Sequence, residues 1–218
     1  MKSKIGKTLV LFFATVSFNQ IYYAQTVAIG KQFWMTKNLD VSVFRNGDPI
    51  PEAKTNEEWQ AAGENKRPAW CYYKNDLANA SINGKLYNFY AVSDKRGLAP
   101  KGFHLPSLQE WDALINYLGG AGLNWTNTSN KLKSTSNWLM DEYMEENPNG
   151  TNSVGFNAQP SGIRESSGYF DGKGKETIFW TKTPLGSFYA YYKEFAEYPQ
   201  NNMYYNKNSG FSVRCIKD

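Results

Sequence analysis

The chain has few of the side chains on which metal and catalytic sites depend, with one histidine and two cysteines in 218 residues. A metal site built on the single histidine, His104, would need carboxylates as further ligands, and none stands at ligand spacing near it in the sequence. The nearby Ser107 hydroxyl is predicted to cap a helix, which makes it a poor nucleophile. We therefore interpret His104 as a structural residue held by a backbone group, and the sequence predicts no metal and no cofactor.

The chain also lacks an apolar run long enough to span a bilayer. Its one apolar stretch, residues 8–18, follows a lysine-bearing start and precedes a small residue, an order typical of a secretory signal peptide. We predict a signal peptide over residues 1–24 and an exported mature chain that starts at or near Gln25. An uncleaved amphipathic or buried helix is the alternative. Because no cysteine stands at the predicted start, we expect no lipid anchor.

A strong charge of one sign is missing as well. Of 24 basic and 20 acidic residues, Lys2, Lys4 and Lys7 lie in the predicted signal peptide, so the exported chain is close to neutral. Without a basic stripe, a nucleic-acid partner is not expected. The length of residues 25–218 suits a single domain, which we expect to be a monomer.

Two capping boxes mark helix starts. Ser107 with Glu110 and Thr55 with Glu58 have the spacing in which a hydroxyl and a carboxylate each accept from the other residue's backbone N–H. The first predicts a helix that ends before a Gly-Gly pair, and the second a short helix that ends at Gly63. The expected buried face of the first helix consists of Trp111, Leu114, Ile115 and Leu118.

Short apolar runs between turn residues predict strands, so the expected fold class is α+β. The predicted strands are residues 33–35, 70–73, 177–182, 188–195, 203–206 and 211–216. In the last of these, Phe211, Val213 and Cys215 share one face. Residues 86–92 fit a strand or a short helix equally well. Residues 123–164 are rich in Asn, Ser, Thr, Gly and Pro, and we expect a long, largely irregular excursion there.

A series of motifs follows in order along the predicted exported part. They are residues 29–39 (IGKQFWMTKNL), 69–73 (AWCYY), 84–88 (GKLYN), 99–106 (APKGFHLP), 110–111 (EW) and 210–215 (GFSVRC). Together they resemble the Fibrobacter succinogenes major paralogous domain over about residues 27–218. The resemblance implies export by Bacteroidota or related bacteria and a C-type-lectin-like fold, with two helices around a small, twisted, mostly antiparallel sheet and long irregular loops. It implies no biochemical activity, because that family has none assigned.

The chain is similar, more weakly, to the sulfatase-modifying-factor group, whose formylglycine-generating members bind copper through a close pair of cysteines before the final strand. Residues 178–208 contain no cysteine, so we predict no such oxidase site. A calcium site like that of sugar-binding lectins is not expected either. Such lectins coordinate calcium through a Glu-Pro-Asn-type and a Trp-Asn-Asp-type triplet. Residues 146–149 (ENPN) resemble the first triplet only with a shift in spacing, and the second is missing near Asn201, Asn202 and Asn206. The carboxylates Asp141, Glu142, Glu145 and Glu146 are interpreted as a solvated helical face.

The last quarter of the chain is dense in tyrosine and asparagine. Tyrosine and tryptophan offer flat faces at low entropic cost and asparagine offers paired donors and acceptors, which suits a sugar ring or a protein partner. The alternative is that about half of these aromatics fill the core of a small sheet. The predicted ligand-binding residues are Trp180, Tyr191, Asn202, Tyr204 and Asn206.

We therefore expect an exported, non-catalytic recognition domain that binds a glycan or an envelope or surface protein. An enzyme with an unrecognised site in residues 123–164 and a purely structural surface component are the alternatives. Because an exported chain with an even number of cysteines usually oxidises them, we also predict a disulfide between Cys71 and Cys215. Two separate buried thiols are the alternative reading of that pair.

Overall fold

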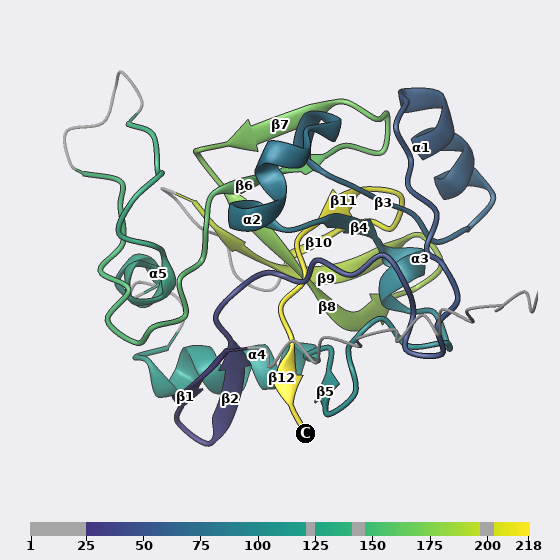
Figure 1. Cartoon of the computed structure of the whole chain (residues 1–218). Coiled ribbons are helices and arrows are strands. Elements are labelled where there is room, and N and C mark those ends of the chain that lie inside the picture. The colour runs from purple at the N-terminus through teal and green to yellow at the C-terminus, as the bar shows by residue number, and fades with distance from the viewer. Residues whose placement is uncertain (1–24, 121–124, 141–146, 197–202) are drawn as a thin grey trace, which may run out of the picture.

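The computed structural model describes residues 25–120, 125–140, 147–196 and 203–218 (Figure 1). The strands are β1 (Thr26–Ile29), β2 (Gln32–Met35), β3 (Trp70–Cys71), β4 (Leu86–Asn88), β5 (Phe103–His104), β6 (Ser161–Arg164), β7 (Phe170–Lys173), β8 (Thr177–Leu185), β9 (Tyr189–Phe195), β10 (Met203–Asn206), β11 (Gly210–Phe211) and β12 (Ile216–Lys217). The helices are α1 (Asn56–Glu64), α2 (Ala80–Asn83), α3 (Phe89–Val92), α4 (Leu108–Tyr117) and α5 (Trp125–Leu132), with short 3₁₀ turns at Tyr73–Asn75 and Leu77–Asn79. The predicted α+β class is confirmed.

The described strands form two sheets. A four-stranded sheet has the order β1-β2-β12-β5, and an eight-stranded sheet has the order β10-β9-β8-β6-β11-β4-β3 with β7 paired to β6. All pairings between these strands are antiparallel except that of β6 with β8. Figure 1 shows the four-stranded sheet and α4 at the bottom of the view, α5 at the left and α1 at the upper right.

Both predicted capping boxes are present. The Ser107 hydroxyl accepts from the Glu110 N–H at 3.2 Å, and the Glu110 carboxylate accepts from the Ser107 N–H at 2.7 Å. Thr55 and Glu58 make the same reciprocal pair at the start of α1, which ends at Glu64, one residue later than expected. Residues 86–92 contain both predicted possibilities, because the strand β4 runs directly into the helix α3.

The expectation for residues 123–164 is wrong in part, because α5 and β6 lie inside this stretch. The buried residues of α5 are Trp125, Thr128, Ser129 and Leu132, which have the spacing of one helix face. Two of these four side chains are polar, so an apolar pattern does not reveal the helix. The described part of residues 133–160 contains no helix or strand, in agreement with the prediction.

The predicted strand over residues 211–216 is divided between the two sheets, as β11 and β12. Phe211, Val213 and Cys215 do share one face, in the largest core cluster. The opposite face is buried as well. Arg214 is fully buried there, where its Nη1 donates to the carbonyl oxygens of Met35 at 2.9 Å and Phe156 at 2.6 Å. Because burial penalises the guanidinium charge, it lowers the pKa of Arg214 to about 9.

Candidate functional site

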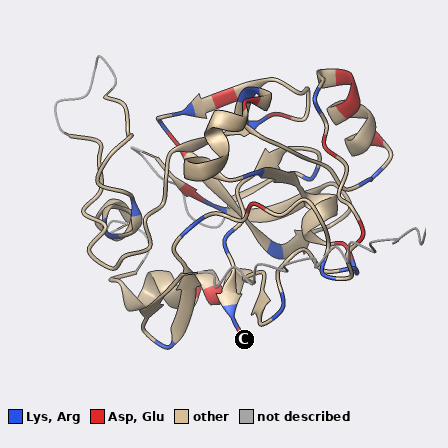
Figure 2. Cartoon of the chain, in the orientation of Figure 1, with Lys and Arg blue, Asp and Glu red and all other residues tan. Residues whose placement is uncertain are grey.

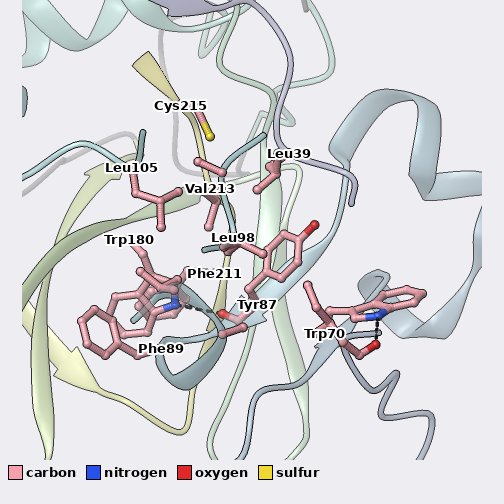
Figure 3. Packing of buried hydrophobic residues seen from close by; sticks show 14 of the residues in the cluster. Leu39, Trp70, Tyr87, Phe89, Leu98, Leu105, Trp180, Phe211, Val213 and Cys215 are labelled. Atoms are coloured by element: carbon pink, nitrogen blue, oxygen red, sulfur yellow. Dashed lines mark hydrogen bonds between the residues drawn. The ribbon is translucent and has the colours of Figure 1, made fainter. Parts of the chain in front are cut away.

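Trp180 does not belong to a surface site, and this part of the prediction is wrong. Its side chain is 1 % exposed, and its ring packs against Phe211 at 4.3 Å and Phe89 at 5.4 Å between centroids. Its indole N–H donates to the carbonyl oxygen of Tyr87 at 2.9 Å (Figure 3). The reason is its place in β8, an interior strand of the larger sheet, on the face that the largest core cluster covers.

Three other predicted residues share one face of the hairpin formed by β9 and β10. Tyr191 stands directly opposite Tyr204, and Asn206 stands directly opposite Tyr189. Because side chains alternate between the two faces of a strand, these four residues project to the same side. We call them the aromatic face. The remaining predicted residue, Asn202, lies outside the described residues.

The aromatic face is open to solvent. Tyr189 and Tyr204 are 45 % and 52 % exposed, while Tyr191 and Asn206 are half-buried. The rings of Tyr189 and Tyr204 meet diagonally across the two strands, with centroids 5.5 Å apart and planes at 69°. Sequence reasoning missed Tyr189 as a site residue. The signal was its position two residues before Tyr191 in a predicted strand, which places both on one face.

Helix α4 explains where the exposed area ends. Lys193 continues the same side of β9, but its side chain is fully buried and its ammonium lies 2.8 Å from the carboxylate of Asp112 on α4. Burial lowers the pKa of Lys193, and the hydrogen bond and charge of Asp112 oppose that effect. The N–H of Leu108, at the start of α4, donates to the Thr183 hydroxyl on β8 at 3.0 Å. The helix therefore covers one part of this sheet face and leaves the aromatic face uncovered.

The opposite side of the β9–β10 hairpin faces inward, and we call it the inner face. Tyr192 is buried there with its ring 5.7 Å from that of Phe211. The Tyr205 hydroxyl donates to the carboxylate of Glu165 at 3.0–3.1 Å. Burial, together with this hydrogen bond, raises the pKa of Tyr205 to about 12. These contacts fix the hairpin to the rest of the sheet.

Several carboxylates gather beside the inner face, which sequence reasoning did not foresee. Burial raises the pKa of Glu176 to about 7, and the negative charges of Glu194, Asp171 and Glu165 add to the effect. Glu165, Asp171 and Glu176 lie close together in the sequence, between the end of β6 and the start of β8, and the pairing of β8 with β9 brings Glu194 to them. In the parts of the chain that the structure describes, no group of three His, Cys, Asp or Glu side chains is arranged to hold a metal ion.

His104 has carboxylate partners instead of the expected backbone partner. Its Nδ1 lies 2.8 Å from an oxygen of Asp218, and its Nε2 lies 2.7 Å from an oxygen of Glu110. Sequence spacing concealed Asp218, which reaches His104 because β5 pairs with β12 at the end of the chain, whereas Glu110 is only six residues away and was assigned to the helix cap alone. The Ser107 hydroxyl donates to Glu110 at 2.7 Å and does not bond to His104. With both ring nitrogens engaged by carboxylates, His104 is not placed to activate Ser107 as a nucleophile. The acids at positions 141, 142, 145 and 146 lie outside the described residues.

The expected disulfide is not formed, and both cysteines are buried free thiols. They occupy separate core clusters. Cys71 lies on β3, an edge strand of the larger sheet, whereas Cys215 precedes β12 of the smaller sheet and its carbonyl accepts from the Met35 N–H at 3.0 Å. Burial raises the thiol pKa of each to about 12, so neither is a reactive thiolate at neutral pH.

Charges of both signs are dispersed over the described residues, with acidic positions gathered on α1 (Figure 2). None of the described helices combines the length and the apolar content that crossing a bilayer requires. No curated protein and no solved structure matches the chain. A family model, that of the Fibrobacter succinogenes major domain, matches residues 27–217. The match covers nearly all of the described chain, including both sheets and the aromatic face, and the chain therefore belongs to the Fibrobacter succinogenes major domain family.

Proposed function

We propose that the chain is an exported, non-catalytic recognition domain that binds a glycan on the aromatic face. The observation that carries the proposal is the grouping of three tyrosines and an asparagine on one uncovered face of β9 and β10. Tyrosine rings stack on the C–H faces of sugars, and an asparagine amide donates to and accepts from sugar hydroxyls. A folded domain normally buries or disperses such rings, so a contiguous exposed group favours a binding surface.

A C-type-lectin-like fold and a signal peptide over residues 1–24 are part of the proposal. The first is supported by two capped helices, α1 and α4, beside mostly antiparallel sheets, and by the pairing of β2 with both β1 and β12, which brings the two ends of the matched domain together. The second rests on the sequence pattern of a basic start and a short apolar run. A single domain over residues 25–218 follows from both.

An envelope or surface protein is the second candidate ligand, because exposed tyrosines also suit protein interfaces. An enzyme whose site lies in residues 123–164, or a purely structural surface component, are the alternatives from other functional classes. The His104 and Ser107 geometry argues against one hydrolytic arrangement, and the buried thiols argue against cysteine nucleophiles. None of the alternatives accounts for the exposed tyrosine pair of the aromatic face.

The test is a screen of the purified chain from Gln25 on immobilised glycans and on chromogenic hydrolase substrates. We expect saturable binding of at least one glycan, loss of that binding in Tyr204→Ala, and no turnover. Tyr169→Ala is the matched control, because Tyr169 is another exposed tyrosine, in the turn between β6 and β7 and away from the aromatic face. Turnover that a single polar substitution within residues 123–164 abolishes would overturn the proposal in favour of the enzyme.

A further inference from the structure

The geometry of the aromatic face restricts the kind of glycan, if the proposed function holds. We infer that the face takes individual sugar units of soluble, uncharged glycans and does not bind the flat surface of an insoluble polysaccharide. Three features carry the inference: the angle between the two exposed rings, the polar groups beside them and the absence of charge among the four side chains.

The exposed rings do not form a flat platform. The planes of Tyr189 and Tyr204 meet at 69° with centroids 5.5 Å apart, so one ring presents an edge toward the other. Two rings at that angle cannot both lie flat against one plane of stacked sugar chains. One ring is able to stack on a single sugar while the other meets that sugar at its edge. This arrangement suits one sugar unit of a flexible chain or a chain end.

Polar groups stand beside the rings at the outer edge of the sheet. The N–H of Lys207 donates to the carbonyl of Phe188, so these two residues form a hydrogen-bonded pair. Hydrogen-bonded and non-hydrogen-bonded pairs alternate along antiparallel strands, which makes the pair of Tyr204 with Tyr191 a non-hydrogen-bonded one. The N–H and C=O of Tyr204 therefore point away from β9, and β10 is an edge strand among those described. Together with the Asn206 amide, they offer donors and acceptors to the hydroxyls of a sugar stacked on Tyr204.

No member of the aromatic face is charged. The nearest continuation of the face along β9 is Lys193, and its charge is buried against Asp112. A sugar with a carboxylate or sulfate group would lose hydration at this face without gaining an opposite charge. One exposed cation, Lys182, lies in the stretch of β8 where the register with β9 shifts. If the site bound an acidic glycan instead, Lys182 would supply the opposite charge, so its substitution tests that possibility.

The experiment compares three groups of probes by calorimetry and by depletion from solution. The probes are soluble neutral oligosaccharides of β-glucan, xylan and mannan, acidic oligosaccharides of alginate and polygalacturonate, and insoluble cellulose and chitin. We expect binding to a neutral soluble probe that Tyr204→Ala weakens by about tenfold or more and Lys182→Gln leaves unchanged. Acidic probes should bind at least about tenfold more weakly, and the insoluble polymers should not deplete the protein.

Two outcomes overturn this inference and leave the proposed function standing. One is depletion by cellulose or chitin that Tyr204→Ala abolishes, and the other is preferred binding of an acidic probe that Lys182→Gln abolishes. Two further outcomes overturn the proposed function and this inference with it. The first is that the protein binds none of these probes and no glycan in the wider screen. The second is that it binds a glycan and Tyr204→Ala leaves this binding intact.

Discussion

The two faces of the β9–β10 hairpin use the same residue type in opposite ways. On the inner face, Tyr192 is buried against Phe211, and the Tyr205 hydroxyl donates to Glu165. On the aromatic face, Tyr189 and Tyr204 contact each other and are about half exposed. Residue type therefore does not distinguish a structural tyrosine from a candidate binding tyrosine in this domain. What distinguishes them is which face of the strand the rest of the chain covers.

This difference has an energetic consequence. Burial of an aromatic side chain stabilises the fold by removing apolar area from water, whereas a half-exposed ring contributes little to stability. Substitutions on the inner face should therefore lower stability and leave binding unchanged, whereas substitutions on the aromatic face should weaken binding and leave stability nearly unchanged. Four variants, taken from the largest expected effect on stability to the smallest, test that separation.

Truncation of Trp180 should give the largest loss of stability among the four variants. Trp180 stands opposite Tyr192, on the same side of the sheet. Trp180→Ala should lower the free energy of unfolding by about 3–5 kcal/mol, because it leaves a cavity between Phe211 and Phe89. Urea denaturation followed by circular dichroism measures the loss. Trp180→Phe keeps a ring in the cavity and should cost less. A loss below about 1 kcal/mol for the alanine variant would contradict the buried position.

Stability should depend on pH through Glu176. Because its pKa is raised from 4.5 to about 7 in the fold, the folded state binds more protons than the unfolded state between those values. Its contribution to stability is therefore fully present below pH 4.5 and is lost as the pH rises through about 7.

We expect Glu176→Gln to remove this part of the pH profile. Thermal unfolding from pH 4.5 to pH 8 should show the variant gaining stability relative to the wild type as the pH rises, most steeply between the two pKa values and levelling off above about pH 7. The difference between the two curves isolates Glu176 from the other carboxyl groups. A difference that stays constant with pH would show that Glu176 titrates normally.

Loss of the Tyr205 hydroxyl should have a smaller effect. Tyr205→Phe removes the hydrogen bond to Glu165 and keeps the ring in place, so we expect a loss of about 1 kcal/mol in the free energy of unfolding. Equilibrium denaturation checks the value. Glycan binding should remain, since the aromatic face is untouched, and its loss would mean that the two faces do not act separately.

On the aromatic face itself, Tyr204→Ala should change the free energy of unfolding by no more than about 0.5 kcal/mol. Its ring contacts only Tyr189 among the described aromatic pairs. Tyr169→Ala serves again as the control, because it measures how much the free energy of unfolding changes when an exposed tyrosine is removed outside the aromatic face. A loss for Tyr204→Ala as large as that for Trp180→Ala would place this face among the structural elements.

The sequence predicts best what local chemistry decides. The caps at Ser107 and Thr55 depend on residues three positions apart, and both helices form where those caps place them. The strand of residues 203–206 is also found as predicted. The caps require only near neighbours in the chain, and β10 pairs with β9, the strand that directly precedes it.

The errors concern properties that the tertiary fold sets. Trp180 is buried because a distant cluster covers its face of β8, which no local pattern reveals. Cys71 and Cys215 remain apart because they lie in different core clusters, although composition and compartment favour a bridge. His104 meets Asp218 only because β5 pairs with the last strand. In each case the decisive partner lies far away in the sequence.

The central claim is that the aromatic face serves binding and not stability, and one paired measurement on Tyr189→Ala/Tyr204→Ala tests it most directly. Unfolding and glycan titration are followed on the same preparation of this double variant and of the wild type. We predict a change in the free energy of unfolding of no more than about 1 kcal/mol and an affinity at least about tenfold weaker for a soluble neutral glycan that the wild type binds. Unchanged affinity, or a loss of stability comparable to that of Trp180→Ala, would contradict the account.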